Sequence, residues 1–311
     1  MLLYPPIQGG FFMQTLSLSK KAFHSLQLLD LPREVLNSEG KIYDFEYKRQ
    51  AKVLKTLYHL EGPIFASKLY TIEMLNSSKQ YLPNNFYIPD SLISVSNEVV
   101  GFTIPKFSGI TLSTVLLDKS IDTKEKSFYL KQVGIMLEQL KNIRAYTPLK
   151  DFYLNDLYAS NFMVNPNNRE LAVVDLDSCK IASNFAFPAR YLTEKSLASL
   201  VPGKYVINSD ETLGAGYIVA NEESDLYCYI IMILNYLYGG YVHKFTLTEY
   251  YEYLNYLESI GINKELIEIF YNLVVPHHNA NPVNFIDSLT NEHVYRAKES
   301  VYSRLRKKKN C

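Results

Sequence analysis

The chain has 311 residues, enough for one large domain or two modest ones with a substantial core. Its 32 basic and 32 acidic residues give zero formal charge, so no overall field favours nucleic acid or acidic lipid. Three scattered cysteines, the absence of a secretory signal and apolar runs too short to span a bilayer predict a cytoplasmic, soluble protein without disulfides.

The N-terminal third mixes short apolar segments with turn signals. Residues 1–28 show no clear period and are expected to form an irregular extension. Residues 29–44 predict a hairpin with its turn at 37–40. Over 45–60, apolar side chains recur at helical spacing, which predicts an amphipathic helix. A second helix over 65–76 and two strands, 92–95 and 99–104, are expected to follow.

The C-terminal two thirds read as mostly helical. Asp122 followed by Glu125 is an N-terminal capping signature, and leucines and valines at three- and four-residue spacing then predict a helix over 122–145. The segment 226–237 is apolar all round, which is typical of a helix buried at the centre of a domain. Further helices are predicted over 246–257 and 263–274, and the basic run 304–309 reads as a solvated tail.

The most informative stretch is 151–175, DFYLNDLYASNFMVNPNNRELAVVD. Asp156 lies in a loop, and five residues later Asn161 opens a short apolar segment. A turn rich in Pro and Asn follows, and a second apolar segment ends at Asp175. A hairpin of this kind brings Asn161 and Asp175 to one end, where their oxygens can hold magnesium against a nucleotide phosphate.

These residues resemble the protein-kinase-like superfamily. The run NDLYASN (155–161) stands where kinases carry HRD-L-x-x-x-N, and DLD (175–177) stands where they carry DFG. The run ESDLYCYIIMILNYLYGG (223–240) resembles the central helix of the kinase large lobe, and IPKFSGITL (104–112) resembles the hinge between the lobes. The resemblance implies a bilobal α+β fold: an extension 1–28, a small sheet-containing lobe 29–107 with a helical insertion at about 61–80, a helical lobe 108–303 and a tail 304–311.

The resemblance also implies a role for individual residues. Asp156 would be the catalytic base, Asn161 and Asp175 the Mg²⁺ ligands, and Asp225 an acceptor for the backbone of the catalytic loop. ATP would lie against the hinge, with Pro105 offering a carbonyl, Phe107 an N–H and Ile104 the rear of the adenine pocket. The phosphate-binding lysine is Lys41, which precedes the predicted helix 45–60, or alternatively Lys68.

Several positions depart from the kinase pattern. Gly40 alone stands where kinases carry a glycine-rich loop, Glu46 is an uncertain ion-pair partner for the lysine, and Asn155 replaces the arginine before the base. We expect an ATP- and Mg²⁺-dependent phosphotransferase that acts on a hydroxyl, with a lean toward Ser or Thr of a protein. The alternatives are a pseudokinase that serves as a binding module and a small-molecule kinase of the aminoglycoside or choline type.

Overall fold

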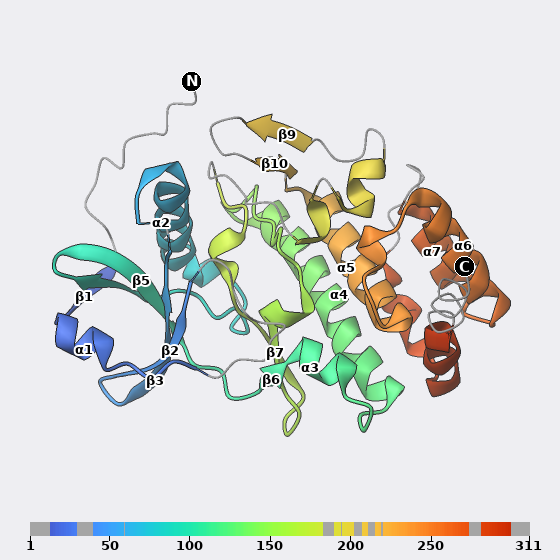
Figure 1. Ribbon diagram of the computed structural model, residues 1–311, viewed down its shortest axis with the longest axis horizontal. Helices are drawn as coiled ribbons and strands as arrows, with labels where there is room; N and C mark the ends of the chain where they lie inside the picture. The colour runs from blue at the N-terminus through green and yellow to red at the C-terminus, as the bar shows by residue number, and fades with distance from the viewer. Residues whose placement is uncertain are drawn as a thin grey trace, which may run out of the picture. The chain divides into compact units, whose positions relative to one another are not determined.

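The computed structural model is a mixed α+β structure (Figure 1). It describes residues 13–29, 40–58, 60–182, 190–193, 195–201, 207–210, 215–218, 220–273 and 281–299. The chain divides into two compact units, residues 1–107 and residues 108–311. The predicted small lobe also ends at residue 107. Each unit is described by itself.

Unit 1 is built on a five-stranded sheet with the order β1-β4-β5-β3-β2. β1 pairs with β4 in parallel, and the other neighbours are antiparallel. The two strands predicted over 92–95 and 99–104 are confirmed as β4 and β5. The strands are β1 Gln14–Leu18, β2 Ile42–Tyr47, β3 Gln50–Thr56, β4 Ser91–Val95 and β5 Glu98–Pro105.

The helix predicted over 45–60 is wrong, because this segment is the hairpin of β2 and β3. β3 lies between β2 and β5 and is buried along its second half, so apolar and basic residues occur on both of its faces and mask the two-residue period. The turn consists of Lys48 and Arg49, both with positive φ, and neither residue type signals a tight turn. Helical spacing here reflects coincidence, and tertiary pairing decides the structure.

The N-terminal segment is more regular than expected. Residues 14–18 form β1, an edge strand of the sheet, and Lys20–His24 form α1, so the prediction of an irregular extension is wrong over these residues. β1 makes its bonds to a strand more than seventy residues away, which no local pattern reveals. The turn predicted at 37–40 falls largely outside the described residues, although an isolated bridge pairs Leu28 with Tyr43.

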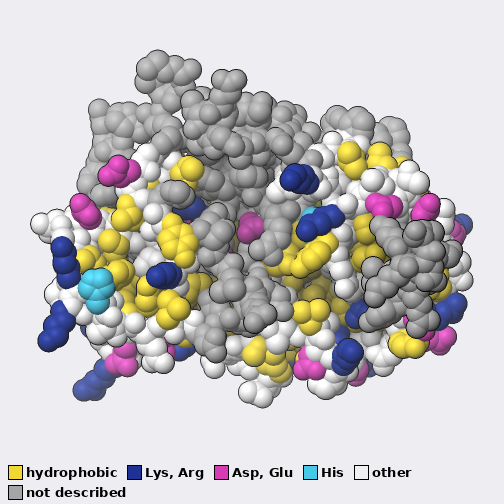
Figure 2. All heavy atoms as spheres, viewed as in Figure 1, with side chains coloured by type: hydrophobic (Ala, Val, Ile, Leu, Met, Phe, Trp, Pro, Cys, Tyr) yellow, Lys and Arg dark blue, Asp and Glu magenta, His cyan; other side chains and the backbone are white. Residues whose placement is uncertain are grey.

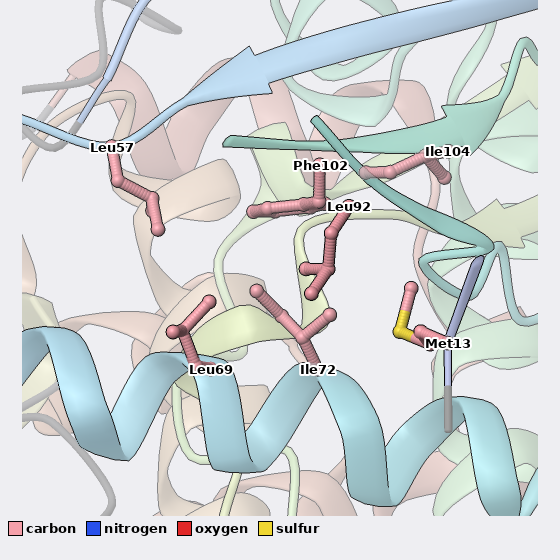
Figure 3. Close-up of a cluster of buried hydrophobic side chains, with 7 residues drawn as sticks. All are labelled: Met13, Leu57, Leu69, Ile72, Leu92, Phe102 and Ile104. Atoms are coloured by element: carbon pink, nitrogen blue, oxygen red, sulfur yellow. The ribbon is translucent and has the colours of Figure 1, made fainter. Parts of the chain in front are cut away.

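The helix predicted over 65–76 is confirmed as α2, Gly62–Ser77. Figure 3 shows Leu69 and Ile72 of α2 directed at Leu92 and Phe102 of the sheet. Because Leu69 and Ile72 are buried in one cluster with side chains of the sheet, α2 is part of the core of unit 1. The full cluster is Met13, Leu57, Leu69, Ile72, Leu92, Phe102 and Ile104, and a second cluster on the sheet contains Leu16, Phe45, Leu54 and Ile93.

Unit 2 is mostly helical, and α4 and α5 run through it (Figure 1). The Tyr229 hydroxyl of α5 donates to the Leu130 carbonyl of α4 at 2.8 Å, and both residues are fully buried. The predicted caps hold, since the Asp122 carboxylate accepts the Glu125 N–H at the start of α4. The helices are α3 Leu112–Leu117, α4 Thr123–Tyr146, α5 Glu222–Tyr238, α6 Leu247–Ser259, α7 Lys264–Asn272 and a further helix over 291–299.

Unit 2 also holds two small sheets. β6 (Ile110–Thr111), β7 (Phe162–Asn165) and β8 (Glu170–Val173) form a three-stranded antiparallel sheet, which confirms the hairpin predicted within 151–175. β9 (Ile207–Asp210) pairs with β10 (Ala215–Ile218). The predicted basic tail 304–309 lies outside the described residues.

Surface charge matches the composition. On the face drawn in Figure 2, basic and acidic side chains are interspersed over the described residues. Within the described part of the chain, each helix is too short or too polar to cross a bilayer.

Candidate functional site

The loop before β7 brings two of the predicted site residues into contact. The Asn161 amide nitrogen donates to the Asp156 carboxylate at 2.9 Å and to the Asp156 carbonyl at 2.8 Å. Asn161 is buried and ends a short 3-10 turn, Ala159–Asn161, whereas Asp156 is partly exposed. The amide nitrogen of Asn161 is thus directed at Asp156, and its side-chain oxygen Oδ1 accepts a long hydrogen bond from the Ser160 hydroxyl at 3.4 Å.

Asp175 lies at the same end of the β7–β8 hairpin as Asn161. The register pairs Phe162 with Val173, and the Val174 N–H continues this pairing by donating to the Asn161 carbonyl at 2.9 Å. Asp175 follows directly, in the left-handed region with φ 62° and ψ 49°. Non-glycine residues rarely adopt this conformation, and Asp tolerates it better than most. The turn ends β8 and sets the direction of the carboxylate.

Asp225 holds the backbone of the same loop by two hydrogen bonds. Its two carboxylate oxygens accept the N–H groups of Leu154, at 2.9 Å, and of Asn155, at 2.7 Å. Asp225 is in the first turn of α5 and fully enclosed, and burial raises its pKa to about 6 although the two N–H bonds act in the opposite direction. The hydrogen bonds from the loop backbone that the sequence predicted for Asp225 are therefore present in the structure.

Asn155 contacts three parts of unit 2 through its backbone and side chain. It is 0% exposed, has φ 61°, and its amide nitrogen donates to the Ser178 carbonyl at 3.2 Å. The Cys228 thiol of α5 lies 3.8 Å from the Asn155 carbonyl as a weak donor, and burial raises the pKa of that thiol so that it stays neutral. Asn155 thus connects the loop, the segment after Asp175 and α5.

The residues predicted to contact adenine lie at the end of β5 in unit 1 and just after it. Pro105 pairs with Lys52 in the register of the sheet, and Ile104 is buried in the core cluster. Phe107 is buried, and its ring meets the Tyr87 ring edge-on at 5.3 Å. Among the described residues the Phe107 N–H donates to no backbone carbonyl.

Lys41 precedes β2, whereas the strand before the helix is β3, so Lys41 does not directly precede a helix as the sequence predicted. Gly40 beside it is needed for strand pairing, since a Cβ there would lie 1.8 Å from the Thr56 carbonyl oxygen. Lys68 lies within α2 and is buried. Neither lysine belongs to the strand that leads into α2.

Sequence reasoning missed two charged residues of unit 1, one on the sheet face that α2 covers and one on α2 itself. Lys55 of β3 is 2% exposed and pairs in register with Phe102 of the core cluster. Glu73 of α2 follows Ile72, and one of its carboxylate oxygens is buried with no hydrogen-bond partner among the described residues; burial raises the pKa of this group. The run AKVLK would have indicated Lys55 had 45–60 been recognised as a hairpin. Lys52, the other lysine of β3, forms a 2.5 Å ion pair with Asp90.

No group of three or more His, Cys, Asp or Glu side chains in the described part of the chain is placed to hold a metal ion. Asn161 and Asp175 form a smaller set, of one amide and one carboxylate. Comparison with protein-family models and with curated proteins finds no match to this chain.

Proposed function

We propose that the chain is an ATP- and Mg²⁺-dependent phosphotransferase with a bilobal protein-kinase-like fold, which transfers the γ-phosphoryl group to a hydroxyl. One observation carries the proposal. Asp156 and Asn161 are in direct contact, and Asp175 follows the residue that pairs with Asn161 at the same end of the β7–β8 hairpin. A base and two oxygen ligands are therefore gathered on one loop and one hairpin, which is the set that phosphoryl transfer uses.

In the proposed reaction Asp156 orients the acceptor. Its carboxylate accepts the proton of the acceptor hydroxyl while the hydroxyl oxygen forms a bond to the γ-phosphorus and the bond to the bridging oxygen of ADP breaks. The Asn161 amide fixes the carboxylate by its 2.9 Å bond, and the Asp225 clamp fixes the backbone just before it. Both sets of hydrogen bonds hold the proposed base in a fixed position, and positioning of the reacting groups supplies much of the rate acceleration in phosphoryl transfer.

The donor set fits magnesium. Mg²⁺ prefers oxygen ligands, and in nucleotide sites it takes one or two protein ligands and completes its shell with waters and phosphates. The side-chain oxygen Oδ1 of Asn161 and the Asp175 carboxylate would supply those two ligands. When bound, the ion would neutralise charge on the phosphates. A small number of acidic ligands in the described part of the chain is thus compatible with an Mg²⁺ ion that binds as a complex with ATP.

Unit 1 would supply the remaining nucleotide contacts. We propose Lys55, in place of Lys41 or Lys68, as the lysine for the α- and β-phosphates, with Glu73 as its partner. Burial without a partner is costly for a carboxylate, and a lysine on the sheet face that α2 covers would offset that cost. Pro105 and Phe107 remain the proposed adenine contacts, with Ile104 behind them.

The acceptor we favour is a Ser or Thr hydroxyl of a protein in the cytoplasm, because the helix that carries Asp225 resembles that of protein kinases. A small-molecule kinase is the alternative within the same chemistry. A pseudokinase that binds partners is favoured by one observation. A Cβ at Gly40 would lie 1.8 Å from the Thr56 carbonyl oxygen, so the close approach of β3 already accounts for the glycine at this position without a phosphate-binding role.

The test separates binding from transfer. Asp156→Ala should bind Mg²⁺-ATP within about threefold of wild type, while γ-phosphate transfer to a generic protein substrate falls by two orders of magnitude or more. Asp151→Ala, which removes an exposed carboxylate at the start of the same loop, is the matched control and should retain both. Nucleotide binding without transfer in the wild type would favour the pseudokinase, and loss of ATP binding in Asp156→Ala would show a structural role.

A further inference from the structure

A second charged cluster in unit 2 lies apart from the proposed active site, around the ring of Tyr236. This ring belongs to the C-terminal half of α5 and is buried. The Lys126 ammonium of α4 lies 5.9 Å from its centroid and the Lys298 ammonium, from the helix 291–299, lies 5.1 Å from it. Eleven residues of α5 separate Tyr236 from Asp225, which is about 16 Å along a helix.

Neither lysine has a carboxylate in contact. Among the described residues no acidic side chain forms an ion pair with Lys126, Lys298 or the neighbouring Lys119. The Lys126 ammonium donates to the main-chain carbonyl of Asp118, while the Asp118 carboxylate accepts hydrogen bonds from Ser120. Glu299, which follows Lys298, interacts with Tyr295, and residues 300–311 contain five basic residues and no Asp or Glu.

The lysines also repel one another. Lys126 is only 6% exposed, and burial lowers its pKa, although Asp118 and Asp122 act in the opposite direction from a distance. Burial likewise lowers the pKa of Lys298, and repulsion from Lys126 and Lys119 adds to that effect. Cations removed from water are ordinarily paired with an anion, because their desolvation is otherwise uncompensated.

Helix ends account for part of this arrangement. The Lys126 ammonium caps the end of α3 through the Asp118 carbonyl, and the stem of Lys298 passes the C-cap Gly239 of α5. A helix C-terminus carries about half a negative charge, so two ends offset only about half of the charge of Lys126 and Lys298; Lys119 is exposed to solvent. A surplus of positive charge remains at the Tyr236 ring.

We propose that Lys126 and Lys298, whose ammonium groups lie near the Tyr236 ring, bind a phosphate-class oxyanion together with the exposed Lys119 nearby. Lysine ammonium groups bind phosphate as point charges, and a divalent anion would relieve their mutual repulsion. The ligand is either free phosphate or a phosphorylated side chain, since both present the same group. The inference is independent of the proposed catalysis, because it uses none of the residues placed there.

The test measures binding of inorganic phosphate to the full chain by calorimetry, at constant ionic strength kept with sodium chloride. Wild type should show saturable binding of one phosphate, and Lys298→Met should weaken it at least tenfold. Lys264→Met removes an exposed lysine that lies 4.0 Å from Glu268, and it should leave phosphate binding unchanged. A second variant, Lys119→Met, should weaken binding in the same direction as Lys298→Met.

Folding is checked in the same samples. Without phosphate, Lys298→Met should unfold at a temperature equal to or above that of wild type, since repulsion is relieved. O-phosphoserine, used as a second probe, distinguishes the sources: tighter binding than phosphate identifies a phosphorylated side chain, and weaker binding identifies the free ion. Unsaturable binding to wild type, or equal affinity in Lys298→Met, would overturn the proposal.

Discussion

Replacing Asp225 by asparagine removes a buried charge while keeping the shape of the side chain. In the wild type the carboxylate accepts two backbone N–H groups, from Leu154 and Asn155. The amide of asparagine offers one acceptor oxygen and one NH₂ group, so one of these N–H groups loses its partner. The variant therefore separates the cost of burying the charge from the benefit of holding the loop.

The cost of burying the Asp225 charge and the cost of leaving one backbone N–H without a partner are of comparable size. Burial raises the pKa of Asp225 from 3.8 to about 6, so the folded state binds the proton more tightly than the unfolded state. The sign follows directly: as pH rises from about 4 to above 6, this group lowers the free energy of unfolding, by about 3 kcal/mol in full. A buried N–H left without a partner costs about 1–3 kcal/mol at every pH.

We expect Asp225→Asn to be less stable than wild type by about 1–3 kcal/mol below pH 4 and close to wild type at pH 7.5. The measurement is urea unfolding at both pH values, analysed as the difference between variant and wild type. Asp287→Asn, which removes a surface carboxylate paired with Lys131, is the matched control and should change stability by less than about 1 kcal/mol at both pH values. Hydrogen exchange at the amides of Leu154 and Asn155 should be faster in Asp225→Asn at both pH values. A stability difference that does not change with pH would refute the reasoning, since it would mean that Asp225 is not a buried charge.

Three further predictions concern the proposed phosphotransferase. Asp175→Ala should weaken Mg²⁺-dependent ATP binding at least tenfold (about 1.4 kcal/mol) and Asn161→Ala less so, measured by titration with and without Mg²⁺; wild-type binding in both would remove the metal assignment. Lys55→Met should weaken ATP binding, measured by the thermal shift that ATP causes. Lys52→Met, which breaks the pair with Asp90, should lower stability and leave ATP binding unchanged. Loss of ATP binding in Lys52→Met but not in Lys55→Met would favour Lys52 as the phosphate-binding lysine. Activity should survive phosphatase treatment, because Asn155 ties the loop to Ser178 without a phosphate; a large loss that ATP restores would contradict this.

Local patterns determined the elements whose signals lie within a few residues. Asp122 caps α4 because its side chain reaches the N–H three residues on, and that geometry is written in the spacing itself. The β7–β8 hairpin and the positions of Asn161 and Asp175 were likewise predictable, because a short turn between two apolar segments admits one pairing. The family resemblance rests on these residues and stays a prediction.

The tertiary structure alone decided the small sheet and the charges buried in it. β2 and β3 are strands because β5 pairs with β3, and a segment with helical spacing of its apolar residues yields to that pairing. Which lysine is buried followed from this, so Lys55 replaced Lys41 as the candidate. The raised pKa of Asp225 has the same origin, since desolvation depends on every element packed around a group and none of these is adjacent to it in the sequence.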